Sequence, residues 1–380
     1  MKSKRLCAAA FGALLASTAP ASALTINLID TGGVTGSPAE AGFRLAASYW
    51  ESVLTNDAIV NFNVGFAPLG PGILGGTSSS LFTYVPVDTY TYLLGASGNS
   101  ALDAQAVSGL PTTSANGSLT VVVPDYFNAA LLDGVAATGS RVAPDNKEIS
   151  NTLALSTANV KALVGGYTDV IDADITFSST FAFDFNPRNG ITPGSYDFVG
   201  VAVHEMGHAL GFLSGAQDFD YSVGGGFPVD DYWWGYGLDM FRYSAPGVLD
   251  WTFGTNSYFS IDGGVTPYGG GYWSTGDING DGWQASHWKA PGTCSNFLGI
   301  MNPYICNGLG DSVSSLDLAA LDAIGWNINF DVIANPGYEF STADMAFAST
   351  NVPEPASWAM MIAGFGMMGG ALRRRRLAAV

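Results

Sequence analysis

The chain contains three histidines, and two of them lie in the stretch Val203-His204-Glu205-Met206-Gly207-His208. On a helix, positions i and i+4 share one face, so His204 and His208 can present two imidazole nitrogens to one metal ion while Glu205 lies beside them. The H-E-x-x-H spacing is typical of zinc peptidases, in which the glutamate is the general base for a zinc-bound water. The spacing therefore predicts Zn²⁺ at the two histidines and peptide hydrolysis assisted by Glu205.

The surrounding residues favour such a site over a chance match on a solvated helix. Residues 198–213 have a helical pattern and are almost wholly apolar apart from the two histidines and Glu205. A buried imidazole or carboxylate without a partner costs free energy, so polar groups on a buried helix indicate a use. Gly211 predicts a sharp turn after the helix.

A catalytic zinc needs a third protein ligand, and the usual sources are missing here. No glutamate lies between His208 and Glu339, so a second helix cannot supply one nearby. Ser214 stands where the H-E-x-x-H-x-x-G-x-x-H pattern places its third histidine, and a neutral serine is a poor zinc ligand.

Three residues remain as third ligand, namely Asp218, Asp220 and His287. His287 is the last histidine of the chain and lies shortly before Gly299-Ile300-Met301-Asn302-Pro303. We prefer His287, and we keep the two aspartates as alternatives.

A displaced third histidine followed by a methionine resembles leishmanolysin-type metzincin peptidases. These enzymes share an H-E-x-x-H-x-x-G helix, a long insertion, a His-Trp pair and a methionine beneath the metal. The resemblance implies that His204, His208 and His287 bind zinc, that Glu205 is the general base, and that Met301 forms the Met-turn. Asn302 departs from the acidic residue expected after that methionine, which puts no catalytic role in doubt.

The resemblance also implies the fold: an α+β, two-lobed catalytic domain. Its upper lobe would hold a mixed twisted sheet and the active-site helix, and its loop-rich lower lobe the Met-turn and a C-terminal helix. A strand over 174–179 would border the cleft and pair with extended substrate. Tyr304, three residues past the methionine, is a candidate oxyanion stabiliser, but a tyrosine beside Pro303 is more often a packing residue, and we leave it outside the predicted site.

The two ends of the chain predict export. Lys2, Lys4 and Arg5 precede an apolar run and an A-x-A-like cleavage site, so residues 1–23 are expected to be a signal peptide. Residues 350–380 contain Val352-Pro353-Glu354-Pro355, an apolar Gly-rich run and four arginines. This order resembles the PEP-CTERM sorting signal. A group of bacterial secreted metallopeptidases carries the same signal, and the chain also resembles that group through Ser286-His287-Trp288 and residues 321–326.

We therefore expect export across the inner membrane, transient anchoring by the C-terminal segment, cutting by a PEP-CTERM sorting peptidase, and an extracellular or cell-surface destination. The alternative is a plain transmembrane helix that stays in the membrane, with the arginines on the cytoplasmic side. Both interpretations leave the catalytic domain outside the inner membrane.

Composition agrees with export. The net charge is −18, and seven of the 14 Lys and Arg residues lie in the two terminal segments, so the part between them is more acidic still. Nucleic acid is therefore excluded as a partner. Cys294 and Cys306 flank Met301 and are expected to form a disulfide in an oxidising compartment, the alternative being two buried thiols.

Acidic side chains at alternating positions mark a candidate Ca²⁺ loop. Asp277, Asn279 and Asp281 alternate as in the first half of such a loop and Gly282 follows, but the closing glutamate is replaced by Trp288. The alternative is an Asx-rich turn that orients His287. Calcium is thus a second candidate ion beside zinc.

Length and hydrophobic pattern predict one catalytic domain over residues 24–349. Its upper lobe would span 24–215, with a Gly/Ser/Thr-rich insertion at about 67–160, and its lower lobe 216–332. We expect strands at 25–29 and 58–66, and helices at 39–54 and 315–325, the elements that must position the site.

The function that these patterns favour is a secreted zinc metalloendopeptidase acting on a protein or peptide substrate. One alternative is a catalytically silent matrix or adhesion protein on the same fold, with an extracellular polysaccharide matrix as partner. The intact Glu205 argues against it, because a silent relative would need no base. The other is a zinc hydrolase that acts on a non-peptide bond.

Overall fold

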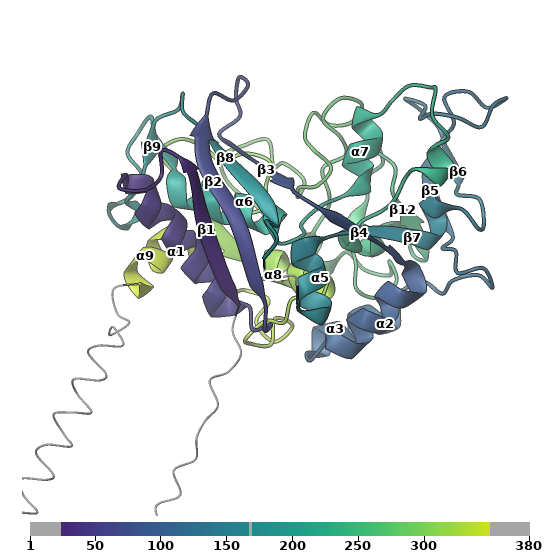
Figure 1. Ribbon diagram of the computed structural model, residues 1–380, viewed down its shortest axis with the longest axis horizontal. Coiled ribbons are helices and arrows are strands. Elements are labelled where there is room, and N and C mark those ends of the chain that lie inside the picture. The colour runs from purple at the N-terminus through teal and green to yellow at the C-terminus, as the bar shows by residue number, and fades with distance from the viewer. Residues whose placement is uncertain (1–23, 167–168, 350–380) are drawn as a thin grey trace, which may run out of the picture.

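The computed structural model describes residues 24–166 and 169–349 of the chain. The expected signal peptide and sorting tail lie outside these ranges. Within them the protein has a mixed α+β fold with several sheets. Figure 1 shows two halves side by side, one built on β1, β2 and β8 and the other containing β4, β5, β7 and α7.

The first sheet has the strand order β1-β2-β8-β3, formed by Thr25–Gly32, Ile59–Ala67, Ala173–Ser178 and Gly75–Ser79. β1, β2 and β8 run parallel, and β3 runs antiparallel to β8, so the sheet is mixed as expected. Val60, Phe62 and Val64 alternate toward the core along β2, because successive side chains of a strand point to opposite faces. The strands expected at 25–29 and 58–66 are confirmed.

The expectation that the strand over 174–179 offers its edge to an extended substrate is wrong, although Asp174 and Thr176 of this strand do line the cleft. This strand, β8, pairs with β2 on one side and with β3 on the other, so β3 is the edge strand. The sequence of β3 is Gly75-Gly76-Thr77-Ser78-Ser79, which carries no apolar side chain. Such a strand has no hydrophobic periodicity, and sequence patterns therefore miss it.

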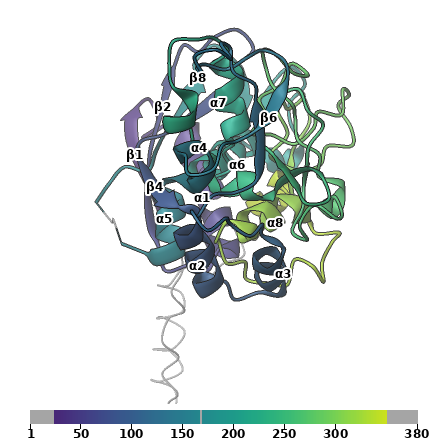
Figure 2. The ribbon, with the colours of Figure 1, turned by 90° about the vertical axis from the view of Figure 1, so that its right-hand side faces the viewer.

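Two helices pack on the first sheet and on each other. α1 (Pro38–Val53) begins at the cap Ser37 with proline as its first residue, and it buries Phe43 and Trp50 completely. α6 (Phe198–Ala209) contacts α1, β3 and β8, and the Trp50 indole donates to the Val203 carbonyl. In Figure 2, α6 lies between this sheet and the loop-rich segments coloured green to yellow.

The expected insertion at about 67–160 contributes strands to three sheets. β3 joins the first sheet, β4 (Phe82–Pro86) pairs with β7 (Thr152–Ser156), and β5 (Val121–Pro124) and β6 (Ser140–Val142) join a five-stranded sheet. That sheet has the order β13-β11-β12-β5-β6, so it combines the insertion with later residues. The helices of this region are α2 (Val87–Ser97), α3 (Ala101–Gly109), α4 (Glu148–Asn151) and α5 (Thr157–Val164).

The residues after α6 form short elements joined by long loops. They comprise α7 (Gly215–Tyr221), η2 (Val229–Asp231), η3 (Gly237–Phe241), β11 (Arg242–Ala245), β12 (Val248–Asp250), β13 (Tyr258–Phe259) and η4 (Tyr268–Gly270). The helix expected at 315–325 is α8 (Ser315–Ala323). β14 (Ser312–Ser314) pairs with β15 (Glu339–Ser341), which leads into α9 (Thr342–Ala348). Between β8 and α6 lie β9 (Phe183–Asp184), η1 (Pro187–Asn189) and β10 (Tyr196–Asp197).

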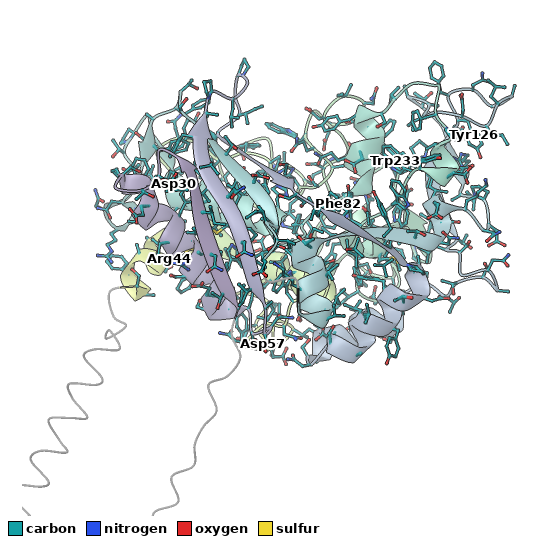
Figure 3. All side chains as sticks on the ribbon, viewed as in Figure 1. Asp30, Arg44, Asp57, Phe82, Tyr126 and Trp233 are labelled. Carbon is teal, nitrogen blue, oxygen red and sulfur yellow. A yellow bond between two sulfur atoms is a disulfide. The ribbon has the colours of Figure 1, made fainter. Side chains whose placement is uncertain are left out.

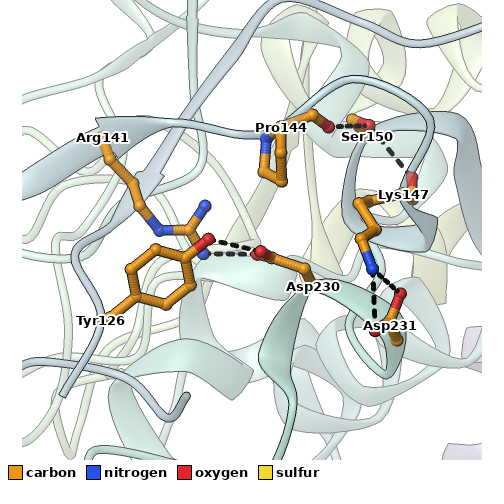
Figure 4. A network of polar contacts seen from close by, with 7 residues as sticks. All are labelled: Tyr126, Arg141, Pro144, Lys147, Ser150, Asp230 and Asp231. Carbon is orange, nitrogen blue, oxygen red and sulfur yellow. Dashed lines mark hydrogen bonds and ion pairs between the residues drawn. The ribbon is translucent and has the colours of Figure 1, made fainter. Parts of the chain in front are cut away.

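A polar network fastens the insertion to η2 (Figure 4). Asp230 accepts hydrogen bonds from the Tyr126 hydroxyl and from Arg141, whose guanidinium lies over the Tyr126 ring. The neighbouring Asp231 forms an ion pair with Lys147. The Arg141–Asp230 pair is largely buried, so removing one partner would leave a charge with little access to water.

Within residues 24–166 and 169–349, no helix combines the length and the apolar character that crossing a membrane requires. The expected membrane anchor falls in the tail, outside the described residues.

Candidate metal centre

Helix α6 carries two of the three histidines. The Asp197 carboxylate caps the helix by accepting from the Gly200 amide, and the helix ends at Ala209. Gly211 then turns the chain with φ of +112°, a conformation that favours glycine, as the sequence predicts. The i, i+4 spacing places the His204 and His208 rings side by side, with centroids 4.8 Å apart.

His287 joins these two histidines from a loop 79 residues further along the chain than His208. The three Nε2 atoms form a nearly regular triangle: 3.1 Å between His204 and His208, 3.0 Å between His208 and His287, and 3.2 Å between His287 and His204. Tetrahedral Zn–N bonds of about 2.0–2.1 Å place nitrogen ligands about 3.3 Å apart. The triangle therefore fits a small divalent ion, and it is the one such cluster of ligand groups among the described residues.

The hydrogen bonds of the three Nδ1 atoms determine whether the Nε2 atoms of the triangle carry protons. Nδ1 of His204 lies 2.7 Å from the Ile300 carbonyl, and Nδ1 of His208 lies 2.7 Å from the Phe212 carbonyl. His287 makes the same kind of contact with the Gln284 carbonyl at 3.2 Å. A carbonyl only accepts, so each Nδ1 carries the proton and each Nε2 of a neutral ring is a bare lone pair. Three lone pairs facing one another repel unless a cation lies between them.

Burial keeps the three rings neutral. Desolvation lowers the pKa of His204 to about 4, and desolvation together with the charge of His204 lowers the pKa of His208 to about 3. Desolvation also places the pKa of His287 well below its usual value. The rings are thus in the protonation state that a metal ligand requires at neutral pH.

Glu205 lies beside the triangle and is held by the edge strand β3. The Thr77 hydroxyl donates to Glu205 Oε2 at 2.8 Å. A Cβ at Gly75 would come within 2.9 Å of Glu205 Oε1, so a side chain there would displace the carboxylate from this position. Desolvation raises the pKa of Glu205 to about 7, against the lowering effect of the Thr77 hydrogen bond.

Met301 lies directly against the metal-binding helix. Its sulfur would be 2.5 Å from a Cβ at Gly207, so the lack of a side chain at Gly207 lets the thioether pack against α6. Met301 is 1% exposed, and its carbonyl accepts from the Trp288 amide, next to His287. The turn is closed by the expected disulfide between Cys294 and Cys306, whose Cα atoms are 5.9 Å apart.

One buried carboxylate that the sequence did not single out ties these segments together. Asp317, near the start of α8, accepts from the Trp288 indole at 2.8 Å and from the amides of Ile300 and Met301. The Ile300 carbonyl in turn accepts from His204, so Asp317 holds both the segment that carries His287 and the carbonyl that orients His204. The available signal was the capping pattern Ser314-x-x-Asp317, which the structure uses as a capping box.

The alternative third ligands have other partners. Asp220 is buried and accepts from the amides of Ile278 and Asn279. Asp218 accepts from the Tyr236 hydroxyl at 2.7 Å, and desolvation raises the pKa of Asp218 to about 6. Ser214 caps α7 and donates to Asp239.

The candidate calcium loop folds around the Asp220 carboxylate. Asp277 accepts from the Tyr221 hydroxyl, the Asn279 amide group donates to Asp220, and Asp281 pairs with Lys289. These contacts fit the Asx-rich turn that was the alternative to calcium. Calcium at this loop stays a prediction.

Two residues near Met301 also have local roles. Asn302 is buried and its amide donates to the Gly299 carbonyl within the turn. The Tyr304 hydroxyl donates to the Thr293 carbonyl at 2.9 Å, and its ring packs beside Trp283. Tyr304 thus contacts its neighbours around the turn, and it also lines the cleft described below.

The triangle and Glu205 open into a cleft of about 1030 Å³. The edge strand β3 lines one side of it, and Trp283 and Tyr304 contribute to another. Its charged lining consists of carboxylates, with no Lys or Arg among the described residues: Asp174, Glu205, Asp218, Asp277 and Asp311. The cleft can hold an extended chain beside a metal ion and a buried carboxylate.

Comparison with known proteins identifies the tail. Residues 351–376 match the PEP-CTERM protein-sorting motif. This motif indicates export and sorting to the cell surface, and it implies processing by an exosortase. No curated protein and no solved structure matches the chain, and no metzincin family does.

Proposed function

We propose that this cell-surface protein is a zinc-dependent metalloendopeptidase with a metzincin-like catalytic domain. The observation that carries the proposal is the triangle of three unprotonated Nε2 atoms with Glu205 beside it at the wall of the cleft. Three neutral imidazoles and an open position are the ligand set of a catalytic zinc, and zinc is the commonest ion in such a set.

His204, His208 and His287 would hold the zinc. When bound, zinc acidifies a coordinated water and polarises a carbonyl as a Lewis acid. Each histidine is kept in position by its Nδ1 hydrogen bond to a backbone carbonyl. Met301 packs beneath the helix that bears two of the ligands.

Glu205 would carry a proton from the attacking water to the leaving amine. Its Oε2 is occupied by the Thr77 hydroxyl, which leaves Oε1 to take the proton of the attacking water and to return it to the leaving amine. A pKa raised to about 7 suits a group that must both accept and release a proton near neutral pH. Glu205 is 5% exposed, and this burial keeps bulk water away from its carboxylate.

The test is a Glu205→Gln variant assayed for casein cleavage and for metal content. Glutamine keeps the shape of the side chain but cannot accept the proton, so cleavage should fall by about 10²–10⁴-fold while the metal content stays unchanged. Equal cleavage by the variant would contradict the assignment of Glu205. An unaltered chain that holds metal and cuts no peptide would favour the silent matrix protein or a hydrolase of another bond.

A further inference from the structure

A second cavity opens beside the cleft of the metal centre. It has a volume of about 290 Å³ and shares Asp218 and Tyr236 with that cleft. We call it the aromatic recess, since most of its lining is aromatic: Phe82, Tyr84, Tyr221, Tyr232, Trp233, Trp234 and Tyr236. Figure 3 labels Phe82 and Trp233, which come from the insertion and from the segment after η2.

The aromatic rings form ordered walls. Tyr84 and Trp234 have ring centroids 4.4 Å apart, and Phe82 and Tyr236 have centroids 5.5 Å apart. Trp233 is backed by a stacked Phe219 at 4.7 Å. Both tryptophans line the recess, and their indole nitrogens are buried and have no acceptor among the described residues.

Asp218 supplies a negative charge to this recess. Its Oδ2 is fixed by the Tyr236 hydroxyl at 2.7 Å, and no described residue donates to Oδ1. Neither the recess nor the cleft is lined by a described Lys or Arg that could neutralise it. A carboxylate with a free oxygen among aromatic rings is complementary to a cation on an apolar stem.

We propose that the aromatic recess binds a lysine or arginine side chain of the polypeptide held in the metal cleft. The ring faces attract the cation, the walls cover the methylene stem, and Asp218 Oδ1 accepts a charge-assisted hydrogen bond. The net charge of −18 draws cationic polypeptides toward the protein. This inference rests on the proposed function, because it assigns the side chain to a peptide substrate.

The recess is held in shape by its neighbours. Tyr232, Trp233 and Trp234 directly follow η2, whose Asp230 and Asp231 are tied to the insertion by the network in Figure 4. Tyr84, whose ring contacts Trp234, lies on β4, which is paired with β7 along its length. The recess is therefore largely formed before a ligand enters, which reduces the entropy cost of binding.

Binding can be measured without cleavage in the full chain carrying Glu205→Gln. The probes are acetylated five-residue peptides of Gly and Ala in which one Lys, Arg or norleucine is moved through each position. Calorimetry and tryptophan fluorescence should show that Lys and Arg bind about tenfold or more tightly than norleucine at one position. A neutral hexasaccharide serves as a rival ligand.

Three variants test which residues cause the preference for Lys over norleucine. Asp218→Asn, which preserves shape, and Tyr84→Leu, at a residue that is 55% exposed, should each remove most of the Lys preference. Asp57→Asn removes the same charge from a site outside the recess and should leave the preference intact (Figure 3). Equal losses in Asp57→Asn and Asp218→Asn, equal binding of norleucine, or hexasaccharide binding that only Tyr84→Leu abolishes would overturn the proposal.

The two proposals fail differently. A chain with intact Glu205 that cuts peptides without any Lys or Arg preference contradicts the recess and leaves the peptidase. A chain that binds the Lys peptides and cuts none of the probes or casein contradicts the peptidase function, and with it the assignment of the recess to a substrate.

Discussion

At the scale of single residues, the site depends on backbone carbonyls as much as on the histidines. Each carbonyl accepts from one Nδ1 and thereby fixes which nitrogen faces the centre of the triangle. His204, Glu205 and His208 could be chosen from their spacing, and His287 by elimination and resemblance. The carbonyls of Ile300 and Phe212 could not, since backbone groups leave no trace in the residue types.

The buried histidines make the stability of the metal-free chain depend on pH. His208 titrates at about 3 in the folded chain and at about 6.5 when unfolded, so between these values the unfolded state binds more protons. The stability is fully present above pH 6.5 and is lost as the pH falls. At pH 5 the loss from His208 is about 2 kcal/mol.

Thermal unfolding in the presence of a chelator, at pH 7 and at pH 5, measures this effect. The unaltered chain should lose more stability between the two pH values than His208→Gln, which has no imidazole to protonate. Equal losses in both proteins would show that the ring is not desolvated in the folded state.

At the scale of elements, the contact between β3 and α6 connects the cleft wall with the proposed base. β3 supplies both the exposed edge of the sheet and the two residues, Gly75 and Thr77, that shape the surroundings of Glu205. Substrate that pairs with this edge would lie beside the residue that positions the carboxylate.

Thr77→Val should lower kcat by about tenfold, because the variant loses a charge-assisted hydrogen bond and leaves the Glu205 carboxylate free to rotate. Thr77→Ser keeps the hydroxyl and should restore the rate. Steady-state kinetics measured together with metal content separates this role from a loss of folding. A valine variant with the kcat of the unaltered chain would contradict it.

The helices and strands that carry apolar periodicity could be predicted from the sequence, as α1, β2 and α6 illustrate. β3 could not, since its five residues are glycine, threonine and serine. The capping role of Asp317 could be predicted from Ser314-x-x-Asp317, but its contacts with Trp288 and Ile300 could not, because these residues are distant in sequence and meet it only in the fold. The pairing of β5 with β12, which joins the insertion to later residues, is a long-range contact of the same kind.

At the scale of the whole molecule, the sorting motif and the candidate metal centre lie in separate parts of the chain. The sorting motif at residues 351–376 indicates the cell surface, and the disulfide between Cys294 and Cys306 fits an oxidising environment. An acidic protein at the cell surface attracts basic polypeptides, and the carboxylates that line the cleft attract the same class of partner.

Deletion of residues 351–376 should abolish sorting to the cell surface and leave the metal content of the exported protein unchanged, because the sorting motif contains none of the three histidines. Cell fractionation followed by immunoblotting measures the surface fraction. Deletion of residues 377–380, outside the motif, is the matched control and should have no effect. A surface fraction that survives the larger deletion would contradict the role of the motif.

If His204, His208 and His287 hold one metal ion, elemental analysis of the purified chain will find it. We expect one zinc per chain, which is lost or greatly weakened in His287→Ala together with casein cleavage and is retained in Asp218→Asn. Full zinc retention in His287→Ala would contradict the assigned third ligand. A chain without any bound metal would contradict the metal centre itself.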